Sequence, residues 1–231
     1  MLSGFLLNRF VCDKNAILNL VFNVCNTMAT QQQIKSYLLD KDKRLKPVIE
    51  SCRFPRSRKN NDIYYGLLSS IVSQQLSVKA ADTIFKRFLD IFDNRYPDAE
   101  LLATMDSRHL RAAGLSHQKV KYVKNVATFA LQDNGLDYQR LKKLNDEELI
   151  VFLTQIKGVG RWTVEMLLMF SFSRGDVFSC DDLGIQQSMR KLYRIKHEKQ
   201  QLKDRMLTIA ESWRPYRTVV CKYLWQWKSL G

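Results

Sequence analysis

The chain reads IKGVGRWTVEMLLMF from Ile156 to Phe170, and this stretch decides the fold. An apolar helical pattern stops at the turn Gly158–Gly160 and then restarts at once. Glycine has no side chain, so it adopts a positive φ without strain and lets an outside group approach the bare backbone. The first N–H groups of the second helix have no partner within that helix, and its dipole places positive charge behind them. Such a turn suits a phosphate oxygen.

Two basic residues, Lys157 and Arg161, flank this turn. A Gly-Val-Gly turn alone is weak evidence, because a plain helical turn would explain it equally well. The whole chain, however, has 37 Lys and Arg against 23 Asp and Glu, a formal charge of +14 spread along its length. This charge favours a polyanionic partner, with nucleic acid as the leading candidate and an acidic membrane surface as the alternative. We therefore predict that the turn, with Val159 at its centre, binds the DNA backbone.

Length and composition predict a globular chain. The 231 residues, 45% of them hydrophobic, are enough to bury a substantial core in one large domain or two small lobes. The cysteines are odd in number and form no CxxC pair, and the three histidines never lie at metal-ligand spacing. The five cysteines are Cys12, Cys25, Cys52, Cys180 and Cys221. We infer a reducing compartment, no structural zinc and no cysteine-bound iron–sulfur cluster.

Residues 1–27 differ in character from the rest of the chain. They are apolar but interrupted by charged residues, so no run approaches the roughly 18 to 20 residues that a bilayer span requires. They also lack the basic start and small-residue cleavage site of a signal peptide. Met28 would serve as a start for the sequence that follows. We predict a leader outside the fold, and the alternative is a helix docked on the body.

The remainder of the chain predicts an all-α protein. From residue 34 onward nearly every segment has the 3.6-residue period of a helix, and none shows sustained alternation. Ser77, Ser116 and the pair Asn145 and Glu148 stand where helix-capping residues belong, each before an apolar stripe. Pro215 falls where a final helix would begin. The connections are short, so we expect a compact helical body.

Several motifs together resemble one protein family. LTQIKGVGRWTVEMLLMF (153–170) followed by DVFSCDDLGI (176–185) resembles the helix-hairpin-helix plus Gly/Pro/Asp (HhH-GPD) signature of base-excision DNA glycosylases. Three further stretches resemble the branch called 3-methyladenine DNA glycosylase II. They are IVSQQLSVKAADTI (71–84), RAAGLSHQKVKYV (111–123) and WRPYRTVVCKYLWQW (213–227). The resemblance spans roughly residues 62–227, with the motifs in the family's order.

The resemblance implies a two-lobed, all-α fold with the active site in the cleft between the lobes. The glycosylase domain would span 28–231, with a middle lobe of about 65–175 and a second lobe formed by 28–64 and 176–231. Larger relatives carry an additional β-rich N-terminal domain, for which this chain has no room.

Asp182 occupies the place of the family's catalytic aspartate. Read without the resemblance, Asp181 and Asp182 would simply cap the helix that follows them. Matched to the family motif, Asp182 would stabilise the oxocarbenium-like sugar or position the attacking water, and Asp181 would be the residue at the helix start. Relatives usually have proline shortly before this pair, where this chain has Ser179 and Cys180. That departure puts the stiffness of the loop in doubt.

Trp162 bears on the reaction and on the substrate. Relatives that also nick the DNA strand place a lysine nucleophile directly after the hairpin's GVGR, where this chain has tryptophan. The resemblance therefore implies hydrolysis by water, which leaves an abasic site. Purines alkylated at N3 or N7 are cationic and stack well on indole rings. Packing of Trp162 in the core is the alternative.

The resemblance also assigns further residues to the base pocket and to DNA. Trp225 matches an aromatic residue of the pocket, while Met166 and Leu183 are candidate walls for which core packing is an equal alternative. Gln75, with Leu76 as its competitor, matches the wedge that fills the gap left by a flipped base, and a solvated helix terminus is the alternative.

Four basic residues are further candidates for DNA contact. Lys119 and Lys121 would touch phosphate or form a solvated face. Arg214 and Arg217 would bind phosphate or pair with Asp181.

The sequence thus predicts a monofunctional glycosylase that removes alkylated purines (3-methyladenine, 7-methylguanine) from double-stranded DNA. Alternatives are a non-catalytic hairpin module, and a glycosylase for uracil or oxidised bases. We expect a monomer without a membrane partner and without a cofactor, apart from a monovalent cation at the hairpin. A bacterial protein of this kind would be cytoplasmic and nucleoid-associated, and a eukaryotic one would be nuclear.

Overall fold

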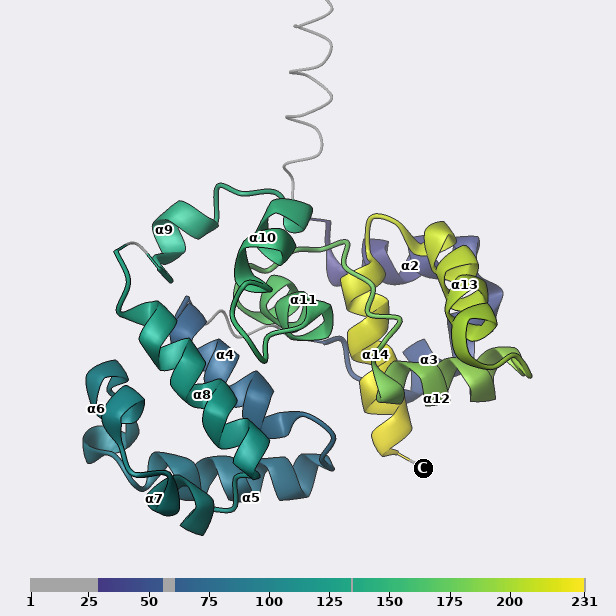
Figure 1. Ribbon diagram of the computed structural model, residues 1–231. Coiled ribbons are helices and arrows are strands. Elements are labelled where there is room, and N and C mark those ends of the chain that lie inside the picture. Colours follow the sequence, from purple (N-terminus) through teal and green to yellow (C-terminus); the bar gives the residue numbers. More distant parts are fainter. Residues whose placement is uncertain (1–28, 56–60, 134, 231) are drawn as a thin grey trace, which may run out of the picture.

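The computed structural model describes residues 29–55, 61–133 and 135–230. Over these ranges it contains helices and no strand, which confirms the predicted all-α fold (Figure 1). The first helices in chain order are α2 (Gln31–Lys41), α3 (Lys46–Ser51), α4 (Ile63–Ser73), α5 (Val78–Leu89), α6 (Ala99–Thr104), α7 (Ser107–Ala112) and α8 (His117–Ala130). They are followed by α9 (Tyr138–Leu141), α10 (Asp146–Leu153), α11 (Arg161–Phe170), α12 (Leu183–Tyr193), α13 (Lys199–Ala210) and α14 (Arg217–Ser229).

These helices gather in two groups in Figure 1. The first group runs from α4 to α11, where α8 packs on α4 and α6, and α4 also contacts α5 and α11. The second group combines both ends of the described chain. In it α14 packs on α12 and α3, and α2 contacts the 3-10 turn Glu211–Trp213. Segments far apart in sequence therefore lie side by side around α14.

The helices begin where the sequence predicts caps. The side chains of Ser77, Ser116 and Asn145 each accept a hydrogen bond from the backbone N–H three residues later. Glu148 reciprocates by accepting from the backbone N–H of Asn145 at 2.8 Å, which completes a capping box. One boundary differs from the prediction. The last helix begins at Arg217 rather than at Pro215, because the intervening residue still has non-helical dihedral angles.

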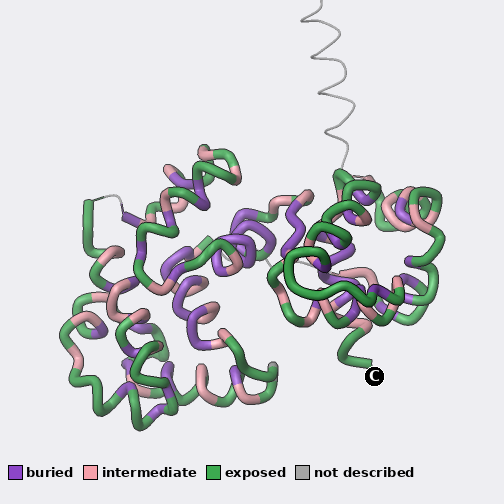
Figure 2. The backbone as a smooth tube through the Cα atoms, turned by 45° about the vertical axis from the view of Figure 1, so that its right-hand side comes forward, coloured by how far each residue is buried: buried purple, intermediate pink, exposed green. Residues whose placement is uncertain are grey.

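One continuous apolar cluster holds the helices together. Figure 2 shows the buried positions on the helix sides that face one another and the exposed positions on the outside. Trp213 and Tyr223 are fully buried. Tyr216 and Trp227 are only partly buried and pack against the edge of the cluster.

Two sequence predictions concern the membrane and the leader. In the ranges that the structure describes, no helix is both long and apolar enough to cross a bilayer. The predicted leader, residues 1–27, lies outside the described residues, so its position relative to the fold stays a prediction.

Candidate active site and DNA interface

Three helices converge on the carboxylate of Asp182. Its Oδ1 accepts hydrogen bonds from the indole Nε1 of Trp225 at 2.8 Å and from the backbone N of Ile185 at 2.9 Å. Its Oδ2 accepts from Nε1 of Trp162 at 3.0 Å. The donors come from α14, from the first turn of α12 and from α11. The half-buried carboxylate therefore has a fixed orientation and lies at the positive end of the α12 dipole.

The structure changes the roles expected of the two adjacent acids. Asp182, and not Asp181, is the N-cap of α12. The same residue therefore both caps the helix and accepts the two indole hydrogen bonds. Asp181 turns outward and forms an ion pair with Lys203 of α13. The expectation that Asp181 begins the helix is therefore wrong, because the chain enters α12 one residue later.

Space beside the carboxylate is limited by Gly184. A Cβ at this position would lie 3.0 Å from Oδ1 of Asp182 and 3.1 Å from Cδ1 of Trp225. Glycine therefore allows the indole to approach the acid closely. The sequence analysis did not single out Gly184, although a glycine two residues after the acid was the available signal.

The predicted pocket residues fall into two classes of burial. Met166 is 8% exposed and belongs to the apolar cluster, one turn after Trp162. Leu183 is 63% exposed, so its alternative as a core residue is wrong. Trp225 stacks on Phe170, with ring centroids 5.8 Å apart and an interplanar angle of 24°. Because Trp162, Met166 and Phe170 are four residues apart, they form one stripe along α11.

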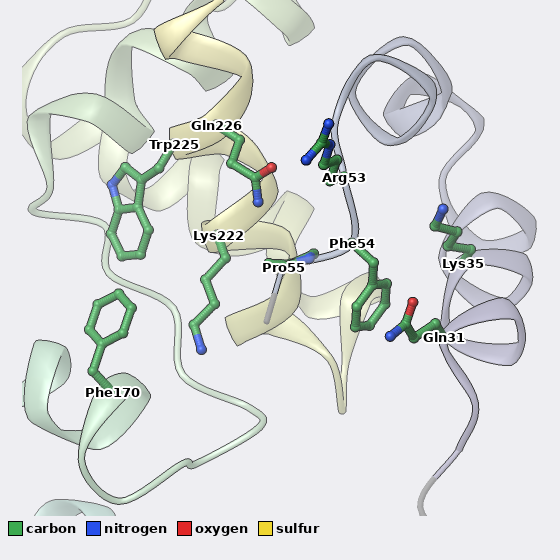
Figure 3. A pocket seen from close by; sticks show the side chains of 9 residues that line it. All are labelled: Gln31, Lys35, Arg53, Phe54, Pro55, Phe170, Lys222, Trp225 and Gln226. Carbon is green, nitrogen blue, oxygen red and sulfur yellow. The ribbon is translucent and has the colours of Figure 1, made fainter. Parts of the chain in front are cut away.

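A cavity of about 730 Å³ borders Trp225 and Phe170. Figure 3 shows these two rings on one side, Phe54 and Lys35 on the other, and Lys222 between them. The remaining lining residues are Gln31, Arg53, Pro55 and Gln226. The lining has three cationic residues and no acidic one, so it disfavours a cationic base. The base pocket is therefore expected on the Asp182 side of Trp225 rather than in this cavity.

Lys222 is a buried cation that the sequence analysis missed. Its ammonium lies 5.0 Å from the centre of the Phe170 ring and donates to the carbonyl of Met169 at 3.3 Å. Burial lowers the pKa of Lys222. The sequence around Lys222 does not indicate that its side chain is buried, because a lysine within an apolar helical stripe usually reaches solvent.

The hairpin turn uses its two glycines differently. Gly158 has φ +107°, and a Cβ there would lie 2.2 Å from Cγ of Tyr122. Gly160 has φ −97°, so of the two glycines only Gly158 uses the freedom to adopt a positive φ. It is the N-cap of α11, has no side-chain cap, and an added Cβ would meet nothing within 4 Å. Val159 is buried between the two glycines, which leaves the outer face to exposed Gly160.

The two basic residues beside the turn are placed differently. Lys157 is exposed, while its carbonyl accepts a hydrogen bond from Nδ2 of Asn125 at 2.9 Å. Arg161 is held by two carboxylates: its Nη2 lies 2.5 Å from Oε1 of Glu147 and its Nε lies 3.2 Å from Oε1 of Glu165. The guanidinium is thus occupied within the protein. At this turn α11 begins without a side-chain cap on its first backbone N–H groups, and Lys157 is exposed.

Comparison with known proteins identifies the family. Residues 68–215 match the family model described as "HhH-GPD superfamily base excision DNA repair protein". The chain belongs to the HhH-GPD superfamily. The DNA-3-methyladenine glycosylase 1 of Schizosaccharomyces pombe is 39% identical over 207 residues, which cover 89% of this chain and 90% of that protein.

Solved structures of the superfamily match the helical fold. The Schizosaccharomyces pombe 3-methyladenine DNA glycosylase in complex with abasic DNA has a TM-score of 0.79 and 36% identity, covering 86% of this chain and 97% of that one. The DNA-3-methyladenine glycosidase of Bacillus halodurans has a TM-score of 0.68 and 33% identity, covering 87% and 91% of the two chains. This HhH-GPD chain therefore shares its fold with proteins named for 3-methyladenine.

The wedge candidates of this HhH-GPD chain lie on an exposed turn between α4 and α5. Gln75 has φ +57°, a left-handed conformation that is uncommon for a residue with a side chain. Leu76 beside it is 37% exposed. Nε2 of Gln74 donates to Oγ1 of Thr163 at 3.2 Å and to the carbonyl of Gly158 at 3.4 Å, so this turn is tied to the hairpin.

Lys119 supports the same turn from inside the protein. Its Nζ donates to the carbonyls of Val72 at 2.7 Å and Gln74 at 2.9 Å, at the C-terminal end of α4. Burial lowers the pKa of Lys119. The expectation of a phosphate contact or a solvated face is therefore wrong for Lys119, because its ammonium satisfies helix carbonyls. Lys121 is exposed and stays a candidate for phosphate contact.

Arg214 and Arg217 do not pair with Asp181. Both instead form ion pairs with Asp176 and Glu211, and Nε of Arg217 lies 2.7 Å from Oδ1 of Asp176. Asp176 precedes the loop that leads to α12. These arginines therefore brace the start of α14 against that loop, and their expected pairing is wrong.

Gly160→Val is expected to weaken binding to all duplex sequences by at least about tenfold, because a side chain would block phosphate from the N–H groups of α11. The fold should be retained, since φ −97° suits valine and the added Cβ meets no protein atom. Gly158→Ala is the contrasting variant, because its Cβ would clash with Tyr122 and lower the melting temperature. Duplex titrations by fluorescence anisotropy check this, and normal affinity of Gly160→Val contradicts it.

Proposed function

We propose that this chain is a monofunctional DNA glycosylase that hydrolyses the N-glycosidic bond of alkylated purines and leaves an abasic site. The observation that carries the proposal is the Asp182 carboxylate, held by two indole N–H groups beside the hairpin helix. A module that only clamps phosphate has no use for an acid between two aromatic rings. The relatives named for 3-methyladenine support the same substrate class.

In the proposed reaction Asp182 acts on the sugar. Departure of the base leaves an oxocarbenium-like sugar, and a carboxylate nearby stabilises the developing positive charge. Its orientation is set before substrate binds, because three N–H donors hold the two oxygens. The same donors withdraw electron density from the carboxylate. We therefore assign to Asp182 an electrostatic role and the positioning of water.

Base flipping assigns roles to the surrounding surfaces. The damaged nucleotide must leave the helical stack before its sugar can reach Asp182, and a side chain must fill the gap. The exposed left-handed turn at Gln75 and Leu76 is the proposed wedge. Hydrogen bonds from Gln74 connect this turn to the hairpin, which supports a joint role for the proposed wedge and the proposed phosphate grip. We propose that a monomer acts in this way on double-stranded DNA.

The indoles favour a cationic leaving base. Purines alkylated at N3 or N7 carry positive charge and already depart easily, so no strong general acid is required. Both indoles donate to Asp182 through their N–H edges, and Trp225 also stacks on Phe170, so we propose that the base stacks on a ring face that these contacts leave open. We place the chain in the branch called DNA-3-methyladenine glycosylase II on these residues. Uracil and oxidised bases are neutral and would need specific hydrogen bonds from the pocket. Excision assays on duplexes that contain these bases test this alternative.

Asp182→Asn is expected to lower single-turnover excision of 7-methylguanine by at least about 100-fold, or about 2.7 kcal/mol of transition-state stabilisation. Asparagine retains the shape and can still cap α12, but its NH₂ group would face a donating indole. Asp181→Asn is the matched control, since it removes an adjacent charge that pairs with Lys203 at the surface. Near wild-type excision by Asp182→Asn would overturn the assignment.

The product is expected to be an intact strand with an abasic site, because Trp162 stands where a lyase has its lysine. Borohydride trapping checks this directly, with a known glycosylase/lyase as the positive control. The wild-type chain should give no covalent protein–DNA adduct, and the product strand should break only after alkali. An adduct at the level of the control would contradict the monofunctional mechanism.

Substitutions of the two indoles should separate stacking from hydrogen bonding. Trp162→Phe and Trp225→Phe keep an aromatic face but lose the donor to Asp182, so excision should fall similarly for every base. Trp162→Ala and Trp225→Ala lose the donor and the aromatic face. Relative to the matching Phe variant, each Ala variant should lower the excision rate further, by a factor at least about fivefold larger for 7-methylguanine than for neutral hypoxanthine, or about 1 kcal/mol. Single-turnover rates on both lesions provide the measurement. An equal extra loss on both would remove the cationic-base argument.

A further inference from the structure

A second carboxylate, Glu165, is buried next to the loop that leads to Asp182. It lies on α11 between Trp162 and Met166 and is only 5% exposed. Its Oε2 accepts a hydrogen bond from Oγ of Ser179 at 2.6 Å, and its Oε1 accepts from Nε of Arg161 at 3.2 Å. The proposed reaction does not use this acid directly. Burying a carboxylate raises the free energy of the folded state unless hydrogen bonds or ion pairs compensate for the lost water. The partners of Glu165 therefore indicate what this residue does in the structure.

Ser179 is the link to the catalytic residue. It is fully buried and lies three residues before Asp182. Its carbonyl accepts a hydrogen bond from the backbone N of Asp182 at 3.4 Å. The carbonyl of the next residue, Cys180, accepts from Nε2 of Gln186 on α12 at 2.8 Å. The short loop is thus attached to α12 at one end and, through the Ser179 hydroxyl, to α11.

The hydrogen bond between Ser179 and Glu165 is short and buried. A hydroxyl that donates to a carboxylate forms a short, charge-assisted hydrogen bond, and burial excludes the water that would compete with it. Burial raises the pKa of Glu165, while the Ser179 hydroxyl and the Arg161 guanidinium act in the opposite direction. Arg161 also reaches Glu147 on α10. The carboxylate therefore joins the hairpin to the loop.

We propose that Glu165 is a positioning residue, which holds the loop Ser179–Asp182 against α11 so that the Asp182 carboxylate meets Trp162. The bond runs between the helix that carries one indole and the loop that carries the acid. Without it, the loop keeps its attachments to α12 and α14, and the hydrogen bond between Trp162 and Asp182 still connects it to α11. The proposal rests on the proposed role of Asp182 and adds the residue that orients it.

The proposal is tested with Glu165→Ala, Glu165→Gln and the milder Ser179→Ala. We expect single-turnover excision of 7-methylguanine to fall by roughly tenfold or more in both alanine variants, since small misplacement of a reacting group is costly. Affinity for duplex should change less than about twofold because the backbone grip remains. Glu165→Gln, which keeps an acceptor for Ser179, should recover most of the rate. The excision rate of the double variant Glu165→Ala/Ser179→Ala should be no lower than that of the slower single variant, because both substitutions remove the same hydrogen bond.

Tyr193→Phe is the matched control for stability. It deletes another 2.6 Å hydrogen bond from a hydroxyl to a carboxylate, between Tyr193 and Asp42 in the second group of helices. We expect it to lower the melting temperature without lowering the excision rate. A rate loss in Tyr193→Phe equal to that in Ser179→Ala would overturn a specific positioning role, as would failure of Glu165→Gln to restore the rate.

A spectroscopic measurement separates this proposal from the proposed function. The indole N–H resonance of Trp162, assigned among four tryptophans by Trp162→Phe, reports its hydrogen bond to Asp182 without any substrate. It should move in Ser179→Ala and Glu165→Ala and stay in place in Tyr193→Phe. An unmoved resonance overturns the positioning role even if the enzyme is active. A moved resonance in a chain that excises no lesion supports positioning and leaves the proposed function as the part that failed.

Discussion

The hydrogen bonds to the Asp182 carboxylate are the constraint on which the rest of this structure depends. They join Trp162 of α11, the first turn of α12 and Trp225 of α14 at two oxygen atoms. α11 belongs to the first group of helices, and α12 and α14 belong to the second. One side chain thus contributes to the start of a helix, to the contact between the two groups and to the proposed chemistry. Substitutions at this residue will affect all three.

Folding and catalysis make compatible demands on that carboxylate. As a cap, it must accept a backbone N–H, and as a stabiliser of an oxocarbenium ion it must remain charged and correctly oriented. The indole donors fix the orientation of the carboxylate, and the proposed base would stack on ring faces that Phe170 does not cover. The resemblance implies a proline shortly before the acidic pair, where this chain has Ser179 and Cys180. In the proposed positioning role, the buried hydrogen bond from Ser179 to Glu165 restrains this loop in place of a proline ring.

The high positive charge has two different uses in the folded protein. Arg161, Arg214 and Arg217 are all held by acidic side chains, and Lys119 is held by helix carbonyls. These cations brace the hairpin, the loop before α12 and the wedge turn. The proposed grip on DNA therefore depends less on guanidinium groups near the turn than on backbone N–H groups and exposed lysines. Net charge favours a polyanionic partner, but it cannot say which cations touch that partner.

The sequence by itself determined the all-α class, most helix starts, the hairpin turn and the family, because these depend on local periodicity, capping and contiguous motifs. It also pointed to Asp182, Trp162 and Trp225 through resemblance. Only the tertiary structure decided that the indole N–H groups face the acid, that Asp182 rather than Asp181 caps α12, and that Gly160 is extended. The partners of Glu165, Lys119 and Lys222 were likewise invisible in the sequence. Ser179 lies 14 residues from Glu165 and Val72 lies 47 from Lys119, and such pairings are set by packing between helices, which local patterns do not encode.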